Sequence, residues 1–71
     1  MTQWGSVKAR RVFAALLQVG WSVKRRSGGS HCVLEWAGWP DYVFAFHDNE
    51  EIGPCMMRRI AKRTGLKRED L

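Results

Sequence analysis

Apolar residues recur at helical spacing in two stretches of the chain, one near each end. The first stretch covers residues 7–19, with Ser6 before it as an N-cap candidate and Gly20 after it, where a helix-ending glycine belongs. The second covers residues 54–64, begins with a proline that the first turn of a helix tolerates, and is followed by Gly65. The pattern therefore predicts two helices that each bury one face. The positions predicted to face the core are Val12, Leu16, Val19, Met57, Ile60, Ala61 and Thr64.

Between these helices the pattern changes to the apolar–polar alternation of half-buried strands. The alternation opens the segment at residues 21–26, and two further strands are predicted at residues 31–36 and 42–46. A Ser-Gly-Gly-Ser turn at 27–30 joins the first two, because glycine adopts the positive φ angles of a tight hairpin. Short links between strands favour an antiparallel meander. The order α-β-β-β-α therefore predicts an α+β domain, with two helices packed on one face of a three-stranded antiparallel sheet.

The remaining segments carry weaker signals. Residues 37–41 are predicted to be a loose connection, residues 47–53 a polar loop, and residues 66–71 a short polar tail. Trp21 and Trp36 fit the core pattern, and we expect both to be structural. Trp4 and Trp39 lie outside the predicted strands, where covering the ends of a thin core is favoured over stacking on unpaired bases.

Length and composition exclude several classes of protein. Seventy-one residues, 45% of them hydrophobic, suit one small folded domain. The longest apolar run, Val12 to Leu17, is far shorter than the ~20 residues of a membrane span, so no membrane association is predicted. Two cysteines, Cys32 and Cys55, are too few for a disulfide framework. We therefore expect a reduced protein of the cytoplasm.

The charges are arranged in blocks that point to an anionic partner. Residues 1–34 carry six bases and no acid, residues 35–51 carry five acids and no base, and residues 52–71 carry six bases against two acids. Within the second helix, four bases form two like-charged pairs at i, i+4, which are mildly destabilising without a partner. These bases are Arg58, Arg59, Lys62 and Arg63. Clustered bases are typical of proteins that bind nucleic acids, although a solvated basic face or an adaptor for an acidic protein explains the same pattern.

His31 is the first candidate for chemistry. Strand alternation puts Cys32 and Leu34 toward the helices and leaves His31 on the open face of the sheet. The same alternation predicts Lys24 and Arg26 on one face of the neighbouring strand, across the hairpin from His31. An exposed imidazole beside cations suits acid–base work on a phosphate, but the spacing alone favours a surface histidine without a role.

His47, after the third strand, has the same two interpretations. A zinc site built from the histidines and cysteines is not expected, because His31 and Cys32 are adjacent in a strand and point to opposite faces. The chain contains no CxxC or HxxxH spacing and no glycine-rich nucleotide loop. The sequence therefore predicts no metal and no cofactor.

Several segments together resemble the HicA family, small bacterial toxins of type II toxin–antitoxin systems that act as mRNA interferases. The most specific element is Ser27-Gly28-Gly29-Ser30-His31 after a basic strand, followed by Phe46-His47 and by Glu51-Ile52-Gly53-Pro54 leading into a basic helix. The other matching segments are Lys8 to Trp21, Met57 to Ile60 and Thr64 to Leu66. The resemblance covers nearly the whole chain.

The resemblance implies a fold similar to a double-stranded RNA-binding domain and an endoribonuclease activity. The histidine after the glycine–serine turn is catalytic in the family, and that position here is His31, with His47 as a possible assistant. It also implies mRNA as substrate and a HicB-type antitoxin as partner. The expected RNA-binding residues are Lys24, Arg25, Arg26, Arg58, Arg59, Lys62 and Arg63. A non-catalytic RNA-binding module of the same fold is the alternative.

Overall fold

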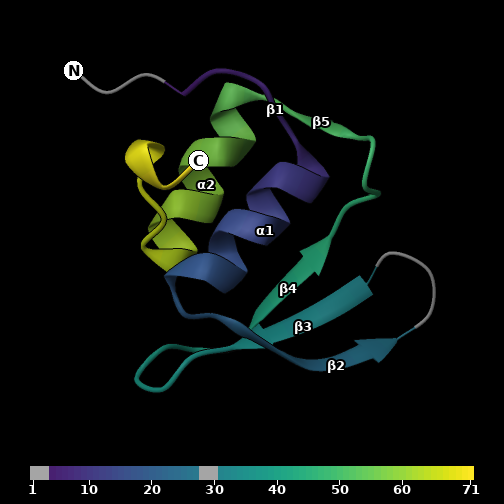
Figure 1. Ribbon diagram of the computed structural model, residues 1–71, viewed down its shortest axis with the longest axis vertical. Helices are drawn as coiled ribbons and strands as arrows, with labels where there is room; N and C mark the ends of the chain where they lie inside the picture. The colour runs from purple at the N-terminus through teal and green to yellow at the C-terminus, as the bar shows by residue number, and fades with distance from the viewer. Residues whose placement is uncertain (1–3, 28–30) are drawn as a thin grey trace.

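The computed structural model describes residues 4–27 and 31–71, and it confirms the predicted α+β architecture. Helices α1 (Ala9–Val19) and α2 (Pro54–Thr64) lie on one side of an antiparallel sheet with strand order β2-β3-β4 (Figure 1). The strands of this sheet are β2 (Ser22–Ser27), β3 (His31–Glu35) and β4 (Tyr42–Ala45). Of the predicted β2–β3 turn, Gly28, Gly29 and Ser30 lie outside the described residues.

The core lies between the two helices and the inner face of the sheet. Both predicted helix stripes are buried or half-buried, and from the sheet Cys32, Leu34 and Phe44 join them, as alternation predicted for β3. Val33, which alternation places on the other face, is also buried (8% exposed) but lies outside this cluster. Apolar burial of this kind is the main favourable contribution to folding, and it fixes which face of the sheet remains uncovered.

The start of the first helix was predicted wrongly. Val7 and Lys8 form a short strand, β1, which pairs with β5 (Glu51–Ile52) in a segment predicted to be a polar loop. The helix therefore begins at Ala9, and Ser6 is not its N-cap. The free amides of the first turn are instead satisfied by the β4–β5 connection: the amide of Ala9 donates to the carbonyl of Glu50 (2.8 Å), and that of Arg10 to the carbonyl of Asp48 (3.2 Å).

The C-terminal tail also differs from the prediction. A short 3-10 turn forms at Arg68–Asp70, Leu66 is buried in the core, and Leu71 packs against it. The strands are close to their predicted limits: β2 both begins and ends one residue later, so that Ser27 belongs to the strand and not to the predicted turn, and β3 and β4 end one residue earlier. The second helix has its predicted bounds, with Gly65 after it in the left-handed conformation (φ 75°).

Three tryptophans close one end of the core, and we call them the tryptophan cluster: Trp21, Trp36 and Trp39. Trp21 is buried, and its indole N–H donates a hydrogen bond to the carbonyl of Thr64 at the end of α2 (3.1 Å). Trp36 and Trp39 stack on each other and both meet Trp21 edge-on. Trp36 was predicted to lie in the core, but this prediction is wrong, since its side chain is 36% exposed. Its ring lies at the surface, where it covers Gly20. Trp39 covers the core end as predicted, and Trp4 is half-buried against the core.

The contact between Trp39 and Gly65 yields a stability prediction. A methyl group at Gly65 would lie 3.0 Å from the Trp39 ring, in a backbone conformation that already disfavours side chains. We expect Gly65→Ala to lower the free energy of unfolding by about 2 kcal/mol and the melting temperature by about 10 °C. Gly38→Ala is the matched control, because Gly38 has a similar φ (87°) with open space around it. Equal losses in thermal denaturation of the two variants would show that the tryptophan contact contributes nothing.

Candidate functional site

An irregularity in β2 decides which cations share a face with His31. The register runs Val23↔Leu34 and then Arg25↔Val33, so Lys24 is an extra residue that forms a β-bulge. Residues paired across an antiparallel ladder point to the same face. Arg25 therefore lies on the outer face, and Arg26, which pairs with Cys32, lies on the inner face. The predicted placement of Lys24 and Arg26 together beside His31 is wrong, because the extra residue in the bulge shifts the alternation of the following side chains by one position.

His31 is exposed at the first position of β3, where it pairs with Ala45 of β4 on one side and with Ser27 of β2 on the other. Arg25 lies opposite Val33, two residues further along β3, and is therefore the diagonal cross-strand neighbour of His31. Diagonal neighbours are about 7–8 Å apart, which a long side chain spans. The outer face thus brings an imidazole and one guanidinium into reach of a common ligand.

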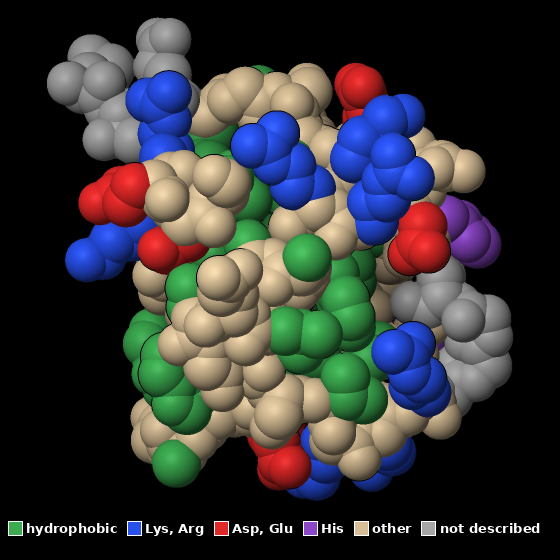
Figure 2. Space-filling view, in the orientation of Figure 1, with side chains coloured by type: hydrophobic (Ala, Val, Ile, Leu, Met, Phe, Trp, Pro, Cys, Tyr) green, Lys and Arg blue, Asp and Glu red, His purple; other side chains and the backbone are tan. Residues whose placement is uncertain are grey.

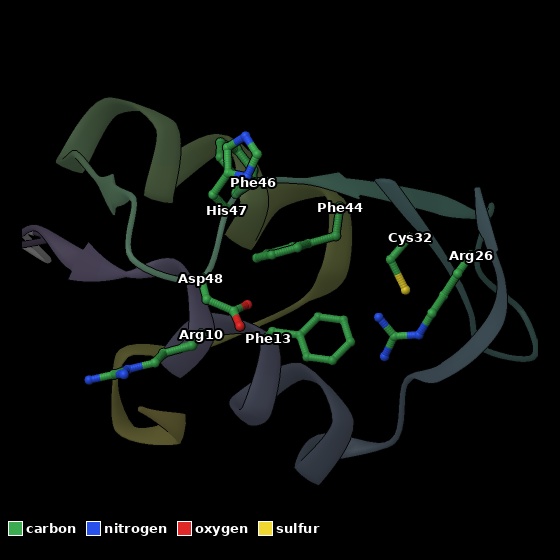
Figure 3. Close-up of a pocket in the computed structure, with 8 residues that line it drawn as sticks. All are labelled: Arg10, Phe13, Arg26, Cys32, Phe44, Phe46, His47 and Asp48. Atoms are coloured by element: carbon green, nitrogen blue, oxygen red, sulfur yellow. The ribbon is translucent and has the colours of Figure 1, made fainter. Parts of the chain in front are cut away.

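A cavity of about 500 Å³ opens on the inner side of the same end of the sheet. Its lining residues are Arg10, Phe13, Arg26, Cys32, Phe44, Phe46, His47 and Asp48 (Figure 3). The three phenylalanine rings form its apolar part, with ring centroids 5.4 Å apart for Phe13–Phe44 and 5.1 Å for Phe44–Phe46. The guanidinium of Arg26 lies over the Phe13 ring at 5.8 Å, a cation–π contact. The cavity therefore combines aromatic surface with charged groups.

Figure 3 shows how these charged groups are directed. The side chains of Arg26 and Asp48 point toward Phe13 in the middle of the cavity, whereas Arg10 and the ring of His47 point away from it. His47 is held by its main chain: its amide donates to a carboxylate oxygen of Glu50 (3.2 Å), and its carbonyl accepts from the amide of Glu50 (3.0 Å). His47 therefore lines the cavity beyond β4, while His31 belongs to the outer face.

Lys24, which the bulge removes from the ladder, is engaged elsewhere. Its ammonium group lies 2.7 Å from a carboxylate oxygen of Asp41, and both side chains are exposed. The hydrogen bond to Asp41, followed by the charge of Asp41, raises the pKa of Lys24 above its ordinary value. Since an exposed ion pair contributes little to stability, its main effect is to neutralise this cation. Lys24 is therefore less available to an anionic ligand than Arg25, because its charge is already balanced by Asp41.

The basic residues of α2 lie on its exposed side, as predicted. All four are solvent-exposed, while the opposite side of the helix is buried in the core. In the part of the chain that the structure describes, none of them forms an ion pair. Burial raises the pKa of Tyr42, and the charge of Arg63 opposes this rise, so Arg63 lies within electrostatic reach of β4. On the face drawn in Figure 2, Lys and Arg side chains lie around the rim with hydrophobic side chains exposed between them.

Apart from Lys24, which pairs with Asp41, the predicted site residues fall into three groups. Arg25 and His31 share the outer face of the sheet, Arg26 and His47 share the cavity, and the α2 bases lie on the helix layer. Sequence reasoning missed the other cavity residues, above all Phe13 and Asp48. The register of β2 and the hydrogen bond from Arg10 to Asp48 bring them together, and no local pattern signals either.

Two further observations concern ligands and membranes. Among residues 4–27 and 31–71, no three histidine, cysteine or acidic side chains lie close enough to form a metal site. Across those same residues, neither helix has the length and apolarity to cross a bilayer. Both cysteines are free, Cys32 buried and Cys55 exposed.

Comparison with known proteins identifies the family. No curated protein and no solved structure matches the chain, so the predicted likeness to a double-stranded RNA-binding domain stays a prediction. The family model described as the HicA toxin of bacterial toxin–antitoxin systems matches residues 9–66. This match runs from the first residue of α1 to the buried Leu66 and includes every strand of the main sheet. The chain therefore belongs to the HicA toxin family.

Proposed function

We propose that this protein is a metal-independent endoribonuclease that cleaves mRNA, with His31 as its catalytic residue. The observation that carries the proposal is the position of His31, exposed at the start of β3 on the uncovered face of the sheet, with Arg25 as its diagonal neighbour. Membership of a toxin family supports it, because cleaving messages stops growth. The alternative is a non-catalytic RNA-binding module of the same fold, and the experiments below distinguish it from the endoribonuclease.

RNA cleavage suits a site with so few reactive groups, because RNA supplies its own nucleophile. His31 removes the proton of a 2′-hydroxyl group, and the 2′-oxygen attacks the adjacent phosphorus. The bond from phosphorus to the 5′-oxygen breaks, the 5′-oxygen takes up a proton from water or from an assisting group such as His47, and a 2′,3′-cyclic phosphate remains. General base catalysis of this kind contributes about 10²–10⁴-fold, and a guanidinium such as that of Arg25 stabilises the charge that develops on the phosphate. This scheme requires no metal.

We also propose that exposed lysine and arginine side chains bind the RNA. Phosphate contacts by Lys and Arg supply much of the affinity of nucleic-acid binding. We assign phosphate contacts to Arg25 of β2, to a smaller degree to Lys24, and to the α2 residues Arg58, Arg59, Lys62 and Arg63, while Arg26 of β2 contacts the RNA from within the cavity. Because the α2 bases and His31 lie on different layers, the substrate must be a flexible single strand that bends around the domain.

The partner that we propose is a HicB-type antitoxin that covers the outer face of the sheet. This face carries Val43, whose side chain is 51% exposed, beside Val33 and Arg25, which pair with neighbouring positions. An exposed apolar side chain next to a cation fits a partner segment with both apolar and acidic residues. Such a segment blocks access of RNA to His31. We place the pair in the cytoplasm, where mRNA is translated.

His31→Ala tests the catalytic role. Because His31 is exposed, we expect a change of less than about 0.5 kcal/mol in the free energy of unfolding. Cleavage of RNA and toxicity are lost, whereas RNA binding persists because the cations remain. Gel analysis of RNA after incubation with purified protein checks the first point, and end-group analysis detects the 2′,3′-cyclic phosphate left by the parent protein.

His47→Ala is the companion variant. A smaller loss of cleavage makes His47 an assistant, and an equal loss makes the two histidines a base–acid pair. Cleavage by His31→Ala at the parental rate contradicts the mechanism and favours the RNA-binding module.

The contribution of the basic residues of α2 to RNA binding can be measured from how the affinity for RNA changes with salt concentration. Single-stranded RNA binding weakens with salt with a logarithmic slope of about −0.7 for each phosphate neutralised. Replacing Arg58 and Lys62 with glutamine therefore makes the slope shallower by about 1.4. Arg11→Gln with Lys67→Gln removes the same charge from exposed sites outside the proposed surface and serves as the control. An unchanged slope in the α2 variant moves the RNA surface to β2.

The antitoxin prediction is tested in cells. Expression of the protein alone is expected to arrest growth, and co-expression with a HicB-type antitoxin to restore it and yield a stable complex. In that complex, slower amide hydrogen exchange is expected in β3 and β4, because the partner covers their outer face. Normal growth at high expression together with the absence of a complex contradicts the toxin assignment.

A further inference from the structure

We propose that the cavity between α1 and the inner face of the sheet holds one unstacked nucleobase of the RNA, with guanine preferred. This inference rests on the proposed function, because it names what the substrate places beside the catalytic strand. It concerns Phe13, Arg26, Phe44 and Asp48, which have no part in the cleavage step.

The shape and surface of the cavity suit a flat aromatic ring. Its volume of about 500 Å³ is within the range of small-ligand sites. Phe13 belongs to α1 and Phe44 to β4, and their rings are tilted at 57° with centroids 5.4 Å apart. Phe46 extends the aromatic surface toward the β4–β5 connection. Proteins that read single-stranded RNA splay bases out onto aromatic side chains and arginine planes of this kind.

The charged groups argue for a base rather than a phosphate. Asp48 directs its carboxylate into the cavity and would repel a phosphate there (Figure 3). In the described part of the chain, neither Asp48 nor Arg26 forms a side-chain hydrogen bond or an ion pair, so both retain their capacity for a ligand. A neutral ring that offers both donors and acceptors satisfies the two groups together.

Guanine fits this pair of groups better than the other bases. A carboxylate accepts hydrogen bonds from the N1–H and the exocyclic amino group of guanine, and arginine donates to its O6 and N7 atoms. Adenine offers no N1–H donor, and cytosine and uracil have no N7 acceptor. Arg26 and Asp48 point toward the middle of the cavity from β2 and from the β4–β5 connection, so one ring lies within reach of both.

Backbone hydrogen bonds hold the wall of the cavity in place, and the cavity lies next to His31 along β3. The carbonyl of Asp48 accepts the amide of Arg10, and that of Glu50 accepts the amide of Ala9, which ties the cavity wall to the first turn of α1. Cys32, which lines the cavity, follows His31 directly in β3, and the two side chains point to opposite faces. An RNA strand that crosses this end of the sheet can therefore place a phosphate at His31 and a neighbouring base in the cavity.

Binding of uncleavable RNA tests the inference without requiring activity. The probes are 2′-O-methyl hexanucleotides of adenosine that carry guanosine, inosine or adenosine at the fourth position, because a methylated 2′-oxygen cannot attack phosphorus. We expect the guanosine oligonucleotide to shift the NMR signals of Phe13, Cys32 and Phe44 in the full chain. We expect it to bind about tenfold more tightly than the inosine oligonucleotide, which lacks the exocyclic amino group.

The variant that isolates the contact is Asp48→Asn. It is expected to abolish the preference for guanosine over inosine, whereas Glu51→Gln, which removes an exposed carboxylate outside the cavity, leaves the preference intact. The ratio of the two affinities is the readout, because a change in overall charge alters both affinities alike. Unchanged signals at Phe13 and Phe44, or a preference that survives Asp48→Asn, overturn the inference.

These results are separable from the test of the proposed function. Cleavage that depends on His31 without any response of the cavity to guanosine refutes the base site alone. A guanosine-specific response in a protein that cuts no RNA supports the base site and refutes the catalytic proposal.

Discussion

The hydrogen bond from the indole of Trp21 to the carbonyl of Thr64 is the contact on which the rest of this small domain depends. Trp21 stands between the end of α1 and the start of β2, and Thr64 is the last residue of α2. Thr64 is itself buried, with its hydroxyl group bonded to the carbonyl of Ile60 (2.7 Å) and to the amide of Leu66 (3.3 Å). One buried donor thus joins the ends of both helices to the sheet. A buried hydrogen bond of this kind is costly to break, because a lone buried polar group loses its contact with water.

The tryptophan cluster and the candidate site occupy opposite ends of the sheet. The first end is closely packed, and the second is open to a ligand. Trp36 and Trp39 close the end where β3 leads into β4, and each covers a glycine that follows a helix. At the other end, where β2 leads into β3, the aromatic side chains leave a cavity open and His31 exposed. A chain of 71 residues whose two cysteines are both free has a thin core, so dense aromatic packing at one end compensates for an open site at the other.

The β-bulge at Lys24 connects the fold to the proposed chemistry. By adding one residue to β2, it turns Arg25 toward His31 on the outer face and Arg26 toward Phe13 in the cavity, while Lys24 pairs with Asp41. Three consecutive basic residues therefore have three different surroundings. In our proposals the first is largely neutralised, the second stabilises charge at the reacting phosphate, and the third contacts a base. A bulge that redirects side chains in this way is a common device near functional sites.

The sequence by itself determined the order of the two helices and the three strands of the main sheet, the buried stripes of both helices, the exposure of His31 and the family, but not the short β1–β5 pair. These features depend on local periodicity and on turn residues such as Gly20 and Gly65, which act within a few positions of the chain. Only the tertiary structure decided where α1 begins, which cations face His31 and which side chains line the cavity. The helix begins at Ala9 because carbonyl groups of Asp48 and Glu50, some 40 residues away, replace a side-chain cap. The register of β2 and the meeting of Phe13 with Asp48 likewise depend on contacts between distant segments, which no local pattern encodes.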